Sequence, residues 1–124
     1  MKIDVSNGEL FDKVSILQIK MEKIKDAKKI NNIKIEYDLL FPLIHSFDLV
    51  IIDNLQKLYY INLELWEVED GIREKEIKKE FDDKFIELAR SVYRLNDLRA
   101  AIKRDINIST DSVVIEEKSY VEWN

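Results

Sequence analysis

The 124-residue sequence contains no cysteine, only two glycines and a single proline. The absence of cysteine excludes disulfides, thiolate metal sites and cysteine nucleophiles, and it is typical of proteins from a reducing compartment. Glycine and proline supply the frequent turns of β-sandwiches and barrels, so their scarcity argues against those folds. The composition therefore favours long helices joined by few connections.

Long apolar runs are also missing. The first residues have no apolar segment of signal-peptide length, and no run approaches the roughly 18 residues of a membrane-spanning helix. We therefore expect a cytoplasmic protein that is neither secreted nor embedded in a membrane. The net charge of −5 disfavours non-specific binding of nucleic acid, which depends on neutralising phosphates. The chain has room for one domain, residues 1–124.

The charges are unevenly distributed along the chain. Residues 13–34 carry seven lysines against two acids, and residues 64–83 carry nine acids against four bases. Residues 84–104 carry six bases against two acids. This segregation has two interpretations: complementary helix faces in an antiparallel bundle, or an anion site lined by the two basic segments.

Apolar residues recur at helical spacing in four segments, which predicts an all-α, antiparallel four-helix bundle-like domain. The first helix should span residues 8–26, because its apolar residues follow alternating steps of four and three: Leu10, Val14, Leu17, Met21 and Ile24. Similar stripes predict helices over residues 30–46, 48–79 and 83–107. We expect Pro42 to kink or end the second helix and Gly71 to weaken the third.

The last segment, residues 109–124, changes character. It is β-like around Val113, and Tyr120 and Trp123 are large apolar anchors that seldom occur in a disordered end. We therefore predict a short extended C-terminal tail laid across the bundle.

Polar residues occupy stripe positions that should be apolar. The apolar rhythm of the fourth segment places Arg99 on the buried face with Asn96 at its edge, and that of the third places Asn62 and Glu69 there. A buried charge is costly unless paired, so Arg99 should meet a carboxylate or a bound anion. One interpretation is an internal Glu69–Arg99 ion pair completed by the two asparagines. The other is a polar pocket in the bundle core.

The pocket interpretation predicts an anionic small molecule, because the planar fork of arginine suits carboxylates and phosphates. The predicted ligand-binding residues are Lys13, Lys20, Asn62, Glu69, Arg73, Arg90, Asn96, Arg99 and Lys103. We predict no cofactor and no metal, and we assign no catalytic residue. Glu64, Glu67 and Asp70 share a helix face that suits Mg²⁺, although exposed acidic faces are far commoner than metal sites.

Several strings of residues are too particular to follow from bundle packing alone: VSNGEL at 5–10, DKVSILQIK at 12–20, LWEVEDGIR at 65–73, LARSVY at 88–93, NDLRA at 96–100, IKR at 102–104 and EEKSY at 116–120. On these strings the whole chain resembles an uncharacterised family, a domain of unknown function found in small bacterial and viral proteins. The resemblance implies proximity to glycosyltransferase and surface-polysaccharide genes, and it brings no established activity.

Three functions stay open. The leading hypothesis is an accessory helical domain that binds an anionic metabolite or a protein partner, with a role in surface-polysaccharide synthesis. The second is a small enzyme, architecturally similar to helical chorismate mutases, whose arginines and lysines bind a dicarboxylate. The third is a structural or oligomerisation module, a homodimer included, that docks through Tyr60 and the aromatic tail.

Overall fold

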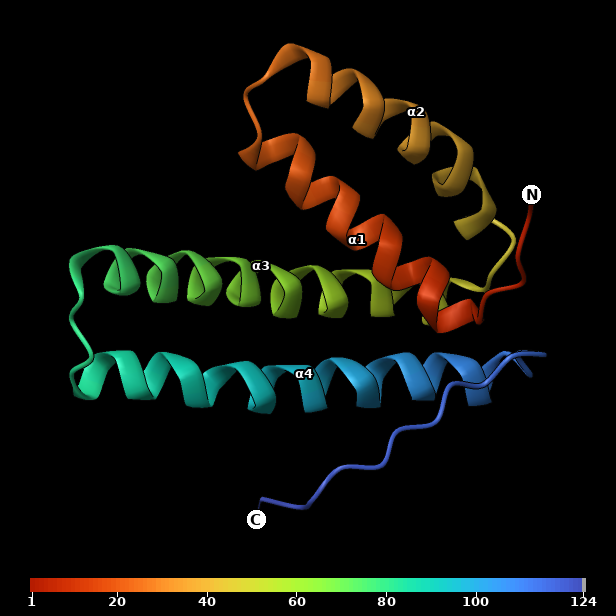
Figure 1. Cartoon of the computed structure of the whole chain (residues 1–124). Coiled ribbons are helices and arrows are strands. Elements are labelled where there is room, and N and C mark those ends of the chain that lie inside the picture. Colours follow the sequence, from red (N-terminus) through yellow and green to blue (C-terminus); the bar gives the residue numbers. More distant parts are fainter. Residues whose placement is uncertain (124) are drawn as a thin grey trace.

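The computed structural model describes residues 1–123, which form four α-helices: α1 (Asn7–Lys23), α2 (Ala27–Ile44), α3 (Leu49–Lys78) and α4 (Asp83–Ser109). The long helices α3 and α4 lie side by side as an antiparallel hairpin, and the shorter α1–α2 hairpin crosses α3 at an angle (Figure 1). Helix α1 contacts all three other helices, whereas α2 packs chiefly on α1. The predicted all-α, bundle-like fold is confirmed.

Helix ends follow local capping chemistry. The hydroxyl of Ser6 accepts a hydrogen bond from the backbone N–H of Glu9 at 3.0 Å, which satisfies a free donor in the first turn of α1. The carboxylates of Asp26 and Asp82 cap α2 and α4 in the same way. Helix α2 ends at Ile44, shortly after Pro42, as expected, while α3 continues through Gly71 without interruption.

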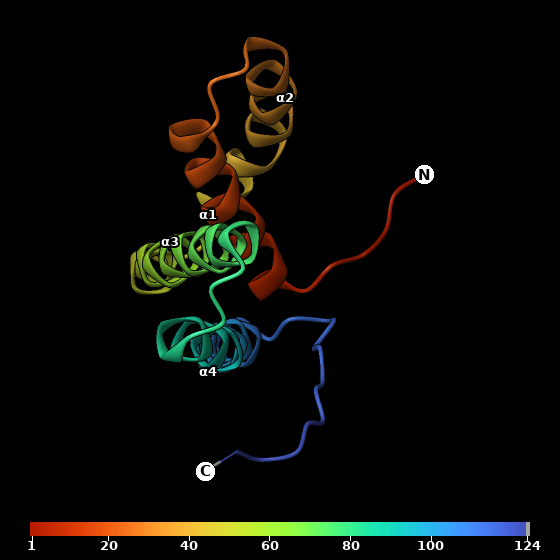
Figure 2. The same ribbon diagram turned by 60° about the vertical axis from the view of Figure 1, so that its left-hand side comes forward.

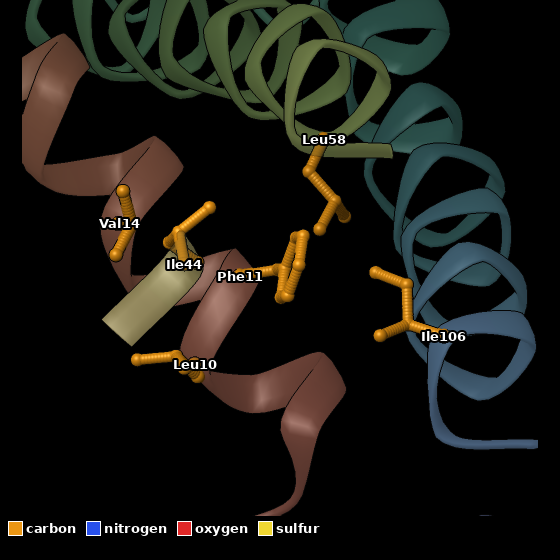
Figure 3. Packing of buried hydrophobic residues seen from close by; sticks show 6 residues of the cluster. All are labelled: Leu10, Phe11, Val14, Ile44, Leu58 and Ile106. Atoms are coloured by element: carbon orange, nitrogen blue, oxygen red, sulfur yellow. The ribbon is translucent and has the colours of Figure 1, made fainter. Parts of the chain in front are cut away.

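The main apolar core lies where α1 meets the other three helices. Phe11 is fully buried there between Ile44 of α2, Leu58 of α3 and Ile106 of α4 (Figure 3). Burying a side chain of this size stabilises the fold by about 1.5–3 kcal/mol relative to leaving it exposed. A second apolar cluster, centred on Leu65, Val68 and Leu95, joins α3 to α4.

A polar residue separates these two clusters along α3, since Asn62 falls between Leu58 of the first and Leu65 of the second. The side chain of Asn62 is buried. The apolar core is therefore interrupted at Asn62, where a buried polar cluster lies.

Beyond α4, residues 110–123 form an extended tail that turns back beneath the helix (Figures 1 and 2). Arg104 pairs with Glu117 at 3.0 Å, and the indole N–H of Trp123 donates to Asp97 Oδ2 at 2.5 Å, so the tail runs antiparallel to α4. The predicted extended tail is confirmed. Within residues 1–123, no helix has both the length and the apolar character needed to cross a membrane.

Candidate functional site

Asp12 of α1 is the centre of a buried polar cluster between α1, α3 and α4. Only 2% of the residue is exposed. Its Oδ1 accepts a hydrogen bond from Asn62 Nδ2 at 2.8 Å, and its Oδ2 lies 3.5 Å from Arg99 Nε. Asp12 is therefore the carboxylate that compensates the charge of Arg99.

The predicted internal pair between Glu69 and Arg99 is wrong. Glu69 pairs instead with Arg73, one turn further along α3, at 3.8 Å. Helix α1 packs onto both α3 and α4, which brings its own carboxylate to Arg99, while the side chain of Glu69 stays 48% exposed. The prediction considered only the stripes of α3 and α4, and so it overlooked the acid supplied by the crossing helix.

Asn62 is held in one orientation and keeps an unused acceptor. Its Nδ2 also donates to Ser15 Oγ at 2.8 Å, and that hydroxyl donates to the backbone carbonyl of Asp12 at 2.7 Å. A carboxylate only accepts, so the amino group of Asn62 must face Asp12. Asn62 Oδ1 is then buried without a partner among residues 1–123, a state that costs about 1–3 kcal/mol.

Lys103 joins this cluster to the tail. Its Nζ lies 2.7 Å from Glu9 Oε2, 3.7 Å from Asp12 Oδ2 and 3.8 Å from Glu116 Oε2. Glu116 in turn accepts a hydrogen bond from the hydroxyl of Ser6 at 2.5 Å. Lys103 therefore connects three carboxylates from α1 and the tail, and its charge is already compensated inside the protein.

The start of α1 is fitted closely against the end of α4. The backbone N–H of Gly8 donates to Asn107 Oδ1 at 2.6 Å, and that of Asn7 donates to Ser112 Oγ at 3.0 Å. A Cβ atom at Gly8 would lie 2.4 Å from the backbone oxygen of Lys103, so only glycine allows this approach. Much of the VSNGEL string is thus explained by the packing of α1 on α4.

Next to the buried cluster, a groove of about 470 Å³ opens between α1, α3 and α4, here called the interhelical groove. Its polar lining is Asn62, Glu69, Asp70, Arg73, Asn96 and Arg99, and its remaining lining is Ile16, Ile19, Leu65 and Trp66. Five of the nine predicted ligand-binding residues therefore lie together: Asn62, Glu69, Arg73, Asn96 and Arg99.

The other four predicted residues lie elsewhere. Lys103 lines a separate cavity of about 640 Å³ between α4 and the tail. Lys13 is exposed and lies 4.0 Å from Glu9, and Arg90 is exposed and pairs with Glu87 at 3.7 Å. Lys20 is in the last turn of α1 and does not line the groove. The spacing of these residues predicts which of them share a helix face, but it does not predict which face lines the groove.

Two contributors were missed from the sequence. Asp12 carried a signal, because Phe11, Ile16 and Ile19 add apolar residues outside the main stripe of α1, and a helix that is apolar on several faces is buried. An acid within such a helix needs a partner. Trp66 is the second, since it is half-buried and lines the groove.

The acidic face of α3 gives no support to a magnesium site. Among residues 1–123, no three acidic or histidine side chains are grouped so that they could hold a metal ion. Glu64 and Glu67 are exposed, and Glu67 lies 3.9 Å from Lys23. Only Asp70 of the three acids lines the groove.

Comparison with known proteins identifies a family for the chain but no function. No curated protein matches it, and no solved structure matches it. The model of a family of unknown function, DUF6165, matches residues 1–123. Because that match spans nearly the whole sequence, the chain belongs to the family of unknown function DUF6165.

Proposed function

We propose that this protein is an accessory helical domain that binds an anionic metabolite in the interhelical groove. One observation carries the proposal. Arg99 lines the groove, its Nε lies 3.5 Å from Asp12 Oδ2, and the guanidinium donates no hydrogen bond to any acceptor within residues 1–123. Both terminal amino groups are therefore available to a carboxylate or phosphate, which can accept two parallel hydrogen bonds from them.

The cluster behind Arg99 holds this guanidinium in place. Asn62 donates a hydrogen bond to Asp12, and the ion pair at 3.5 Å between Asp12 Oδ2 and Arg99 Nε restricts the guanidinium. Ordering a long side chain before the ligand arrives removes part of the entropic cost of binding. A planar guanidinium held at one edge is suited to bidentate recognition of an anion.

The rest of the groove narrows the ligand class. Glu69 and Asp70 offset the positive charges of Arg73 and Arg99, which disfavours a bare anion and favours a ligand with one anionic group and several hydroxyls. The apolar face of a sugar packs on an indole such as Trp66, while its hydroxyls bond to amide and carboxylate groups. An anionic sugar, such as a sugar phosphate or nucleotide sugar, meets these requirements.

The family resemblance noted from the sequence supports the same ligand class, because it implies a setting near glycosyltransferase and surface-polysaccharide genes. A cytoplasmic role in surface-polysaccharide synthesis is therefore part of the proposal.

A thermal-shift screen of sugar phosphates, nucleotide sugars, nucleotides and dicarboxylates tests it. A ligand at 100 times its dissociation constant stabilises the native state by roughly 2.7 kcal/mol, a shift easily seen in a domain of this size. Asn96 lines the groove and makes no hydrogen bond within residues 1–123, so Asn96→Ala should weaken the ligand shift without changing the ligand-free melting temperature.

Two lysine substitutions on α4 form a matched pair for the same screen. Arg99→Lys keeps a positive charge for Asp12 but loses the fork, so it should abolish the shift. Arg90→Lys, on the exposed side of α4, should leave the shift unchanged. A wild-type protein that responds to nothing in the panel, or a shift that survives Arg99→Lys, would contradict the proposal.

The enzyme alternative is tested by the same panel. A dicarboxylate would engage Arg99 and Arg73 together, since both line the groove. Arg73 is already paired with Glu69, which makes the groove a poorer match for two carboxylates than for one. A response to the dicarboxylates alone, together with their turnover at high protein concentration, would favour the enzyme alternative.

A further inference from the structure

Helix α2 carries large apolar residues on two faces. The inner face, with Ile33, Tyr37 and Ile44, packs towards α1 and the main core. On the outer side, Ile35, Leu39 and Leu43 are 56%, 70% and 51% exposed. Helix α2 is the outermost element of the fold, and α1 is its principal neighbour (Figures 1 and 2).

These three outer residues, here called the α2 stripe, form a continuous row. They are spaced by four residues, so each lies next to the following one on the helix surface. The outer face of a peripheral helix is ordinarily polar, and apolar residues at consecutive turns of such a face mark an interaction site. The α2 stripe therefore calls for a partner that buries it.

Charges at the two ends of α2 are opposite in sign. Three lysines and one acid (Lys25, Asp26, Lys28 and Lys29) lie at its N-terminal end, and Asp48 follows its C-terminal end. All five are exposed. Leu39 lies midway along the stripe, so a second copy of the helix laid antiparallel across it brings each basic end to the partner's acidic end. Complementary charge of this kind selects the partner and its orientation.

We propose that the α2 stripe is the contact surface of a homodimer, in which α2 of each copy packs antiparallel about a two-fold axis at Leu39. Such an interface is isologous, with the same patch used on both copies. Ile35 then faces the partner's Leu43, and the lysine end of α2 faces the partner's Asp48. The proposal is independent of the interhelical groove, which lies between other helices.

Measurement of mass in solution over a range of protein concentrations tests the dimer. We expect a dimer for the wild type and a monomer for Leu39→Glu. Because Leu39 is exposed, the substitution should leave helicity and melting of the monomer intact. Ile77→Glu is the matched control, since Ile77 is 80% exposed near the end of α3 and should leave the dimer unchanged. A monomeric wild type, or a dimer that survives Leu39→Glu, overturns the proposal.

The absence of cysteine allows a second test that also reads orientation. Leu39→Cys should oxidise to a disulfide-linked dimer, because the two copies meet at the axis and their Cα atoms come within bonding range. Ile35→Cys should crosslink efficiently to Leu43→Cys when the two variants are mixed, and poorly to itself. Ile77→Cys serves as the background control. Self-crosslinking of Ile35→Cys above the mixed reaction would overturn the antiparallel arrangement.

Discussion

Asp12 and Arg99 face one another across the α1–α4 interface, with 3.5 Å between Oδ2 and Nε. The acid is buried and the guanidinium is partly exposed to the groove. Lys103 approaches the same Oδ2 at 3.7 Å, so one carboxylate compensates two cations from α4. This arrangement makes Asp12 the residue on which the docking of α1 most depends among the charged groups.

Replacing Asp12 should therefore be costly. Asp12→Ala leaves Arg99 without its carboxylate and removes the acceptor for Asn62, and we expect a loss of about 2–3 kcal/mol. Urea unfolding followed by circular dichroism measures it. Glu69→Ala removes an exposed pair within α3 and should cost less than about 1 kcal/mol. Equal losses for the two variants would contradict the assignment of Asp12 as the partner of Arg99.

The two glycines should respond in opposite ways to alanine. At Gly8 the new Cβ would lie 2.4 Å from a backbone oxygen of α4, which must move, and we expect destabilisation of about 1–3 kcal/mol. At Gly71 the nearest atom is Leu88 Cδ1 at 3.2 Å, at the end of a flexible side chain. Because alanine is favoured over glycine within a helix by up to about 1 kcal/mol, Gly71→Ala should be neutral or stabilising. Thermal unfolding of both variants decides the point.

The α3–α4 turn should contribute a stability that depends on pH. Hydrogen bonds to Asp82 and Glu80 raise the pKa of Lys75, and hydrogen bonds from Lys75 and the Phe85 backbone lower the pKa of Asp82 from its ordinary value of 3.8. A lowered carboxyl pKa stabilises the fold above that ordinary value, and the stabilisation is lost as pH falls through the lowered pKa.

Lys75→Met should therefore lower the melting temperature at neutral pH. The difference between variant and wild type should narrow as the pH is reduced below 3.8. The raised pKa of Lys75 gives the converse at high pH, where the difference should narrow as pH rises above 10.5. A difference that is constant across the acid range would contradict a role for the Lys75–Asp82 pair.

We expect the four helices to remain folded when the tail after Ser112 is removed. Truncation keeps the Ser112 hydroxyl that accepts from Asn7 but removes Glu116 and the aromatic contacts of Trp123. The Arg104–Glu117 pair is exposed, and Lys103 keeps Glu9 and Asp12 when Glu116 is lost, so we expect destabilisation of about 1 kcal/mol. The oligomeric state should be unchanged if the dimer forms through α2, and a fall from dimer to monomer would favour the tail as the interface.

The sequence predicted the helices well because they are long and their apolar residues repeat regularly. The stripe through Leu10, Val14 and Leu17 is buried as expected. The polar positions Asn62 and Arg99 were also identified, since each breaks such a stripe. Their partners were not, because a periodic pattern shows which face of a helix is buried without showing what lies against it. The pairing of Arg99 with Asp12 depends on the angle at which α1 crosses, which local spacing does not encode.

The hydrogen bond from Gly8 to Asn107 has a consequence for the order in which the helices assemble. The first turn of α1 reaches this acceptor only when α4, 99 residues further along the chain, has formed. Until then Asp12 also lacks both of its cationic neighbours, so the first hairpin exists with an uncompensated acid on its docking face. Helices α3 and α4 are joined by a short turn and can pair as soon as both are made, because closing a short loop costs little entropy. We therefore expect α3 and α4 to pair before α1 docks onto them.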